Sequence, residues 1–381
     1  MSANATQLDF SAPKPSWLLS TTILLSFLLP YVRGFLIFPI YAVLLFFALP
    51  RLRLQHFDIL FGLLLLIFFF WKLIALNFFD CFQLFRVFFG YYFFYLFFKS
   101  FESLTFINFN KAVLLVAVAV LVEAILINTI VDPAQLAVFP NFETSTARTA
   151  LYGFYQRPYS IGSNASVTSV LITVMLSLAY IQRQHFYRSR FAESLGILAI
   201  VALISGAGFC ISALYFLSKL KLRSFLPALG ILLFSVFFIS SDLQPVFLTK
   251  LSSSYMTFLM AFKEAQIGDV VATLHKSSDL MYQFLFGSFK GGAGGYGGDF
   301  GWLDFFTSMG FTGLGLFIVF FASKLNSVNF IPLSLFFLAS FHYSAMMSGV
   351  GQILMGFCFA LTPKTNAVAK QSPIVEEIYG S

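Results

Sequence analysis

Three charged residues stand inside long apolar runs of the sequence and are the first candidates for chemistry. Lys72 follows LFGLLLLIFFFW, Arg86 precedes VFFGYYFFYLFF, and Glu123 lies within AVLLVAVAVLVEAILI. Charges inside membrane spans are costly and usually mark a ligand or ion site. Lys72 and Arg86 flank the segment around Asp80, so the alternative is that both side chains extend to the membrane surface. Glu123 is too deep to do so, and we expect it to pair with Lys72 or Arg86.

Two arginines stand in the polar segment 132–160. An arginine side chain presents a planar fork that matches two phosphate oxygens at once. An arginine cluster beside a bilayer therefore suits a lipid-linked phosphate or pyrophosphate. For Arg148 an ordinary ion pair with Glu143 or Asp132 is the favoured alternative, whereas the context of Arg157 favours a role in ligand binding.

The segment 287–315, GSFKGGAGGYGGDFGWLDFFTSMGFTGLG, joins a long polar stretch to an apolar one. Seven glycines fall within its first 12 residues. Glycine tolerates backbone conformations that other residues avoid, so this backbone can approach a ligand closely. The segment also holds one cation and one carboxylate in its polar part, Lys290 and Asp299. The alternative interpretation is a flexible surface loop.

The composition indicates an all-α, polytopic integral membrane protein. Of 381 residues, 59% are hydrophobic and only 10% are charged, whereas soluble domains carry about 25% charged residues. The net charge of +7 is expected to mark cytoplasmic loops and not a nucleic-acid site. The three cysteines lie far apart without metal-ligand spacing, and we interpret them as small core residues. No metal-ligand cluster is visible in the sequence, and we expect no metal and no cofactor. A polar leader precedes the first apolar run, and we expect no cleavable signal there.

We predict about 12 membrane spans, with a range of 10 to 14, in a single transmembrane domain over residues 1–381. A span needs about 20 apolar residues. The predicted pair 191–204 and 207–217 is too short for two crossings, and we expect a hairpin of half-spans that turns at Ser205-Gly206-Ala207-Gly208. The other spans are expected near 17–31, 35–49, 57–76, 84–98, 111–131, 161–181, 224–240, 301–322, 330–345 and 349–361.

The basic residues predict the orientation. With these spans, the Lys and Arg residues of the short loops and of the tail fall on one side together with both termini, and that side is cytoplasmic by the positive-inside rule. The opposite side receives two long periplasmic loops, 132–160 and 241–300. Part of the second loop, 252–265, is expected to form an amphipathic helix on the membrane surface.

Four pieces of the chain, spread over about 150–320, together resemble the O-antigen ligase/polymerase superfamily. They are Arg157-Pro158 with Gly162 and Asn164 before a span, the hairpin LISGAGFCISALYFL, the run LMYQFLFGSFKGG, and Asp299 followed by Trp302-Leu303, Gly310 and Gly313. Their order and spacing are similar to those of the family. The resemblance implies a multi-pass, GT-C-like glycosyltransferase of the bacterial inner membrane.

Two departures bear on the kind of enzyme. Many relatives carry Ser-Arg at the hairpin turn, where this chain has Ala207-Gly208 and therefore no cation. Ligases of the family usually carry a His close before the last outer-loop helix, often beside Asn, whereas His275 stands well before that helix without an Asn. This favours a polymerase. His342, in FHYSAMMSGVGQ, either faces the bundle interior near the outer side or is a core histidine bonded to a helix backbone.

The resemblance then implies a Wzy-type O-antigen or polysaccharide polymerase. Its donor and acceptor are undecaprenyl-pyrophosphate-linked oligosaccharide repeat units, joined on the periplasmic face. The candidates for substrate binding are Arg157, Arg86, Lys72, Arg148, Lys290 and Asn164, and those for catalysis are Asp299, Glu123 and His342. Cations would neutralise the leaving pyrophosphate, and a carboxylate or imidazole would accept the acceptor hydroxyl's proton. Membrane lipids and a chain-length regulator protein are the other expected partners.

Three alternatives stay open. An O-antigen ligase would transfer finished glycan to lipid A-core by the same chemistry. A flippase or transporter of lipid-linked oligosaccharides would also suit charges within spans, although the sequence has no internal repeat and concentrates its polar mass on one face. A purely structural membrane protein is the third. No P-loop or dinucleotide fingerprint is present, in keeping with a polymerase that needs no nucleotide.

Overall fold

The described part of the chain consists of helices joined by turns. The structure is a computed structural model, and it describes residues 17–28, 43–52, 54–101, 104, 106–129, 158–184, 189–218, 279–287 and 300–362, except 45, 159 and 163, with short pieces between 260 and 272. Among these residues there is no strand. The predicted all-α class is therefore confirmed for the part of the chain that the structure describes.

The helix bounds follow the apolar runs of the sequence. The elements are α1 (Trp17–Ser26), η3 (Leu49–Arg51), α3 (His56–Leu73), α4 (Phe78–Lys99), α5 (Phe109–Thr129), η5 (Ser160–Gly162), α7 (Ala165–Ile181), η6 (Gln182–Gln184), α8 (Arg190–Ala202), α9 (Gly206–Leu217), α13 (Leu280–Phe286), α14 (Gly301–Lys324), α15 (Phe330–Ala339), η7 (Ala345–Met347) and α16 (Gly349–Ala360). Four of the described helices, α3, α4, α5 and α14, are long and apolar enough to cross a membrane.

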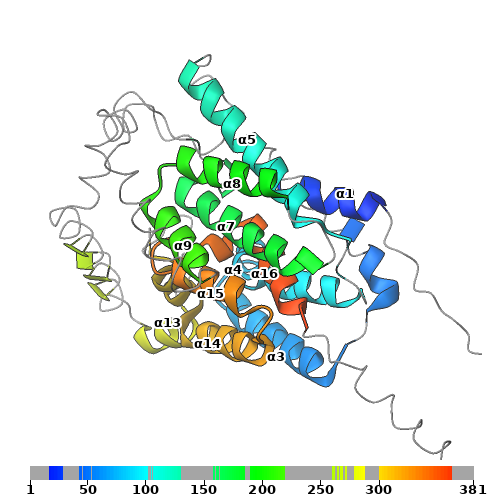
Figure 1. Cartoon of the computed structure of the whole chain (residues 1–381). Helices are drawn as coiled ribbons and strands as arrows, with labels where there is room; N and C mark the ends of the chain where they lie inside the picture. Colours follow the sequence, from blue (N-terminus) through cyan, green and yellow to red (C-terminus); the bar gives the residue numbers. More distant parts are fainter. Residues whose placement is uncertain are drawn as a thin grey trace, which may run out of the picture.

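Helices α4 and α16 form the centre of the bundle, with α7, α8 and α9 on one side and α3, α13 and α14 on the other (Figure 1). Gln352 on α16 places its amide against the backbone of α4: its Nε2 donates to the Val87 carbonyl at 2.6 Å, and its Oε1 accepts the Tyr91 N–H. In a regular helix these two backbone groups pair with each other. The inserted amide fixes the register between α4 and α16.

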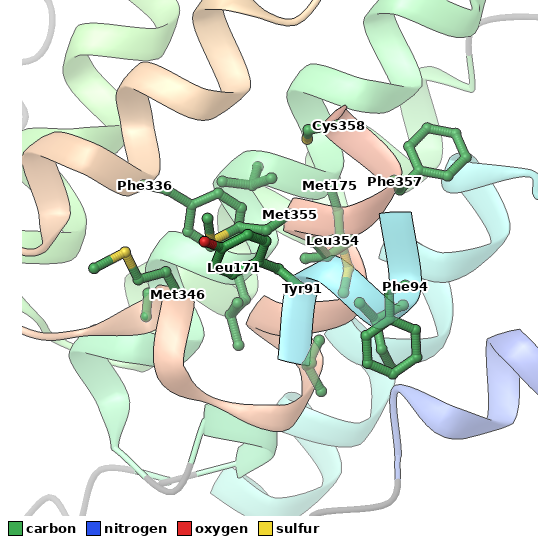
Figure 2. Close-up of a cluster of buried hydrophobic side chains, with 14 of the residues drawn as sticks. Tyr91, Phe94, Leu171, Met175, Phe336, Met346, Leu354, Met355, Phe357 and Cys358 are labelled. Atoms are coloured by element: carbon green, nitrogen blue, oxygen red, sulfur yellow. The ribbon is translucent and has the colours of Figure 1, made fainter. Parts of the chain in front are cut away.

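The core is built largely from aromatic rings. Figure 2 shows apolar side chains of α4, α7, α15 and α16 meeting around Tyr91, which is 1% exposed. The Tyr91 ring also contacts Phe317, Phe320 and Phe359, with centroid distances of 5.8, 5.4 and 5.4 Å. Tilted and edge-on contacts of this kind are favourable for aromatic pairs. Several phenylalanines of the described helices therefore pack inside the protein.

A buried ion cluster joins one end of three helices. Asp58 of α3 is 0% exposed and forms ion pairs with Lys99 of α4 and with Lys324 of α14, the latter at 3.1 Å. The Tyr95 hydroxyl donates to the same carboxylate at 2.9 Å. We call this end of the bundle the basic end. Lys72 lies near the other end of α3, and we call that end of the bundle the far end.

The predicted pair of short helices is present, but the predicted turn at Ser205-Gly206-Ala207-Gly208 is wrong in position, because Gly206, Ala207 and Gly208 already lie in α9. That the two helices are half-spans stays a prediction. Helices α8 and α9 are 13 and 12 residues long, and the chain turns between them at Leu203 to Ser205. The Ser205 hydroxyl accepts the Gly208 N–H at 3.1 Å and donates to the Ser166 hydroxyl at 2.7 Å. The turn is therefore fixed to the start of α7. Helix α9 then runs along α7, where the Thr173 and Ser212 hydroxyls lie 2.7 Å apart.

Helix α14 is folded sharply at Gly310. This residue has φ 65° and ψ −170°, a combination almost confined to glycine. Trp302 and Phe317 are 15 residues apart in sequence, and their ring centroids lie only 5.6 Å apart. A straight helix would separate them by about 22 Å. The predicted span 301–322 is thus helical, but its first part folds back beside its second part and it is not one straight crossing.

The predicted span 330–345 is wrong in its extent, because α15 ends at Ala339. The Ser340 carbonyl is taken by the Trp302 N–H of α14 at 3.0 Å, so the helix does not continue. Helices α15 and α16 have 10 and 12 residues, or roughly 15 and 18 Å. The Asn329 side chain donates to the Cys358 carbonyl at 3.0 Å. The two helices form a hairpin that returns to the basic end.

The remaining predictions on architecture are not tested. The predicted span 224–240, most of 35–49, the loop 132–160 and most of the loop 241–300 lie outside the described residues. The count of 12 spans and the GT-C-like fold therefore stay predictions.

Candidate polar site at the far end of the bundle

Two glycine backbones meet where α13 ends and α14 folds. Gly287, at the end of α13, has φ 82° and ψ 168°, which is again a conformation almost confined to glycine. A Cβ atom on Gly287 would lie 2.4 Å from the Ser308 carbonyl, and one on Gly310 would lie 2.5 Å from the Gly287 nitrogen. The LFG run and the GFTG run of the sequence are thus brought together, with no room for a side chain at either glycine.

Lys72 stabilises this junction. Its Nζ donates to the Ser308 carbonyl at 2.7 Å, and the residue is 0% exposed. Because α14 breaks two residues later, this carbonyl lies at the end of a helical segment and needs a partner. The alternative that Lys72 extends to the membrane surface is therefore wrong, since its ammonium is bonded to a backbone carbonyl inside the protein.

Asp304 lies next to this junction, one turn before Ser308. The Ser308 side chain interacts with the Asp304 carboxylate. The Oδ1 atom of Asp304 is buried and has no hydrogen-bond partner among the described residues. Buried polar atoms without a partner are rare in proteins, and each needs an explanation such as a missing ligand.

Arg86 and Gln283 add two more buried atoms of this kind. The Arg86 Nε and the Gln283 Oε1 have no hydrogen-bond partner within the part of the chain that the structure describes. Arg86 lies on α4, and Gln283 lies on α13 one turn before Gly287. One buried donor atom and two buried acceptor atoms thus lack a partner on helices α4, α13 and α14.

Aromatic contacts place these groups at the same end of the bundle. Phe89 of α4 packs against Phe305 of α14, with ring centroids 6.0 Å apart. Arg86 lies about one turn before Phe89 on the helix, and Asp304 directly precedes Phe305. Phe68 of α3 contacts Phe89 as well, at 6.3 Å. We define Lys72, Arg86, Gln283, Asp304 and Ser308 as the far-end site.

Glu123 lies in a different contact. It is 4% exposed on α5, and its Oε1 accepts the Ser160 N–H at 3.4 Å. The expected pairing of Glu123 with Lys72 or Arg86 is wrong: Lys72 reaches α14 instead, and no ion pair joins Arg86 to any carboxylate among the described residues. Glu123 instead anchors the short helix η5 that precedes α7.

Asn164 has a structural contact. Its Oδ1 accepts the Ser166 N–H at 2.8 Å, so it caps the N-terminus of α7. An N-cap of this type contributes about 1 kcal/mol to helix stability. The predicted role in substrate binding is not needed to explain this residue.

His342 lies in the turn between α15 and η7 and not within a helix. It is partly exposed, and its ring centroid lies 4.2 Å from that of Tyr343. The alternative of a core histidine is therefore wrong, because His342 is partly exposed in a turn that begins after α15 ends at Ala339.

Four predicted site residues lie outside the described residues: Asp299, Arg157, Arg148 and Lys290. The structure adds Asp304, which the sequence reasoning missed. The rule that selects Glu123, a charge inside an apolar run, also selects Asp304 in FGWLDFF and Asp58 in HFDILF. Among the described residues, no group of three or more His, Cys, Asp or Glu side chains could hold a metal ion.

The fold is that of a helical membrane protein, and single buried atoms of Arg86, Gln283 and Asp304 lack hydrogen-bond partners at one end of the described bundle. Comparison with protein-family models, with curated proteins and with solved structures found no match. The likeness to the O-antigen ligase/polymerase superfamily therefore rests on the sequence pieces alone.

Proposed function

We propose that the protein is a polysaccharide polymerase that joins undecaprenyl-pyrophosphate-linked repeat units on the periplasmic face of the bacterial inner membrane. The observation that carries the proposal is the far-end site, where a guanidinium and a carboxylate have buried atoms without partners. A reaction that needs both a charged leaving group and a proton acceptor would use these two groups. The four sequence pieces that resemble the superfamily support the same class.

The chemistry assigns one role to each group. The acceptor sugar hydroxyl attacks C1 of the donor sugar, a new C–O bond forms, and the bond from C1 to the pyrophosphate oxygen breaks. The Asp304 carboxylate accepts the hydroxyl proton as general base. Arg86 stabilises the negative charge that develops on the leaving undecaprenyl pyrophosphate. Arg157 and Asp299 stay candidates for the same two roles.

Lys72 has a supporting role in this proposal. Its ammonium is bonded to the Ser308 carbonyl, one turn from Asp304, and it fixes the helix segment that carries the base. Lys72 is thus a positioning residue in this proposal and not a substrate-binding one. The orientation rests on Lys99 and Lys324 at the basic end, which the positive-inside rule assigns to the cytoplasm.

A flippase of lipid-linked oligosaccharides is the second candidate, because one observation favours it. Transporters build midplane sites from discontinuous helices, and α14 is broken at Gly310 while α15 and α16 are each too short to cross. One observation counts against a flippase. The partnerless buried atoms of Arg86, Gln283 and Asp304 lie on helices around the contact of Gly287 with Gly310, at a single end of the bundle. We expect this arrangement for a fixed catalytic site.

Deletion of the gene separates these functions. We expect lipid A-core to carry at most one repeat unit, with the polymer ladder lost on a lipopolysaccharide gel. A ligase deletion would leave core without any repeat, and a flippase deletion would leave single lipid-linked repeats on the inner leaflet. Either of these last two outcomes rejects the polymerase proposal.

A further inference from the structure

A pocket opens at the basic end of the bundle, away from the far-end site. It has a volume of about 210 Å³ and lies between α7, α9 and the segment that joins α14 to α15. Two hydrogen bonds beside the pocket show that it lies at the basic end. Gln182 donates to the Ile107 carbonyl at 2.9 Å, and Asn326 donates to the Leu361 carbonyl at 2.8 Å. Both bonds join the ends of helices on the side of Lys324.

The walls of this pocket are mostly apolar. Ile181, Val328, Ile331 and the rings of Tyr180 and Tyr215 line it. The Tyr215 hydroxyl already donates to the Leu176 carbonyl at 2.9 Å, so this side chain presents its ring. An apolar wall at a membrane surface suits a hydrocarbon chain better than a polar metabolite.

Arg183 brings one positive charge to the same pocket. It lines the pocket, it is exposed, and its guanidinium carbon lies 4.2 Å from the centroid of the Tyr180 ring. No carboxylate forms an ion pair with Arg183 among the described residues. The guanidinium is therefore held over an aromatic wall with its hydrogen-bonding edge available.

We propose that this pocket binds an anionic phospholipid of the adjacent leaflet, with an acyl chain against the apolar walls and the phosphate at Arg183. Basic pockets between membrane helices are suited to anionic headgroups, and the arginine fork fits phosphate oxygens. A free phosphate would compensate the positive charge of Arg183 but would leave the apolar walls of the pocket exposed to water. A neutral lipid would fill the walls and leave the charge uncompensated, and a zwitterionic phospholipid would bring an ammonium group beside the arginine together with its phosphate.

The experiment uses the full-length protein in detergent, with native mass spectrometry as the readout. Phosphatidylglycerol and phosphatidylethanolamine with identical acyl chains are added at equal concentration. We expect preferential retention of phosphatidylglycerol. Arg183→Gln should weaken that retention about fivefold, the effect of one basic residue near an anionic surface. Ile331→Trp should fill the pocket and remove the bound lipid.

The matched control is Arg190→Gln. Arg190 is exposed at the start of α8 and does not line the pocket, so its variant should retain lipid like the wild type. Equal loss in both arginine variants, equal retention of the two lipids, or full displacement by soluble glycerol phosphate would each overturn the proposal. If Ile331→Trp does not fold, Val328→Phe tests the same wall.

Discussion

The Gly287 nitrogen and the Gly310 α-carbon lie so close that a Cβ atom on Gly310 would stand 2.5 Å from that nitrogen. Both glycines adopt backbone conformations that other residues avoid. The end of α13 and the fold in α14 therefore depend on each other. Lys72 and Asp304 interact with Ser308 beside this contact, so the glycine pair determines the position of the far-end site.

Replacement of either glycine tests the junction. Gly310→Ala and Gly287→Ala should each destabilise the protein by on the order of 3 kcal/mol, because a methyl group meets backbone atoms and the conformation is strained. The measurement is thermal unfolding of the purified protein in detergent. Gly315→Ala is the control, since nothing lies within 4 Å of a Cβ there, and its helix propensity should improve by up to about 1 kcal/mol. Equal melting of Gly310→Ala and Gly315→Ala would contradict the fold in α14.

Lys72→Met tests the positioning role. Methionine keeps much of the length and loses the hydrogen bond, so the Ser308 carbonyl is left buried without its partner, at a cost of about 1–3 kcal/mol. We expect a lower unfolding temperature in the absence of any substrate. Lys111→Met, at an exposed position, should melt like the wild type. An unchanged unfolding temperature together with a lost polymer ladder would show instead that Lys72 contacts substrate.

The sequence indicated which segments form the far-end site but not the contacts between them. It singled out the LFG run, Gly310 and Lys72, and the structure brings all three to one junction. It did not predict that Lys72 would reach a backbone carbonyl on α14, because a helix break has no local sequence signal apart from a glycine. A glycine within an apolar run is compatible with a straight helix as well as with a fold.

Asp58→Asn tests the ion cluster at the basic end. The variant leaves Lys99 and Lys324 beside each other without their shared carboxylate. Breaking a buried pair in this way typically costs about 3–5 kcal/mol. Lys99→Met should lower the free energy of unfolding by less than Asp58→Asn does, because Lys324 still compensates the Asp58 carboxylate. Thermal unfolding compares the two, and the assignment fails if Lys99→Met is the more damaging change.

Asp304 shows why the catalytic candidates were incomplete. The sequence drew attention to Asp299, which stands in a glycine-rich run, whereas Asp304 follows it by five residues in an apolar run. Only packing shows that the Oδ1 of Asp304 is buried without a partner. Similarly, Glu123 was expected to pair with Lys72 or Arg86, whereas its Oε1 accepts the Ser160 N–H, a contact that spacing in the sequence does not indicate.

Arg86 variants test the charge at the far-end site. Loss of a group that stabilises developing charge typically lowers the rate about 10²- to 10³-fold. Arg86→Gln should therefore abolish the polymer ladder, and Arg86→Lys should fail as well because the planar fork is lost. Membrane abundance is measured in parallel by immunoblot. A full ladder from Arg86→Lys, or a loss of ladder that follows a loss of protein, would remove Arg86 from the site.

The central claim is tested most directly by polymerisation with the purified protein in lipid vesicles that contain undecaprenyl-pyrophosphate-linked repeat units. Wild-type protein should produce a ladder of polymers without any nucleotide. Asp304→Asn should slow product formation by about 10²- to 10⁴-fold, as expected for loss of a general base, while Asp80→Asn, an exposed carboxylate at the same end, should leave the rate unchanged. No polymer from folded wild-type protein, or a wild-type rate from Asp304→Asn, would contradict the account.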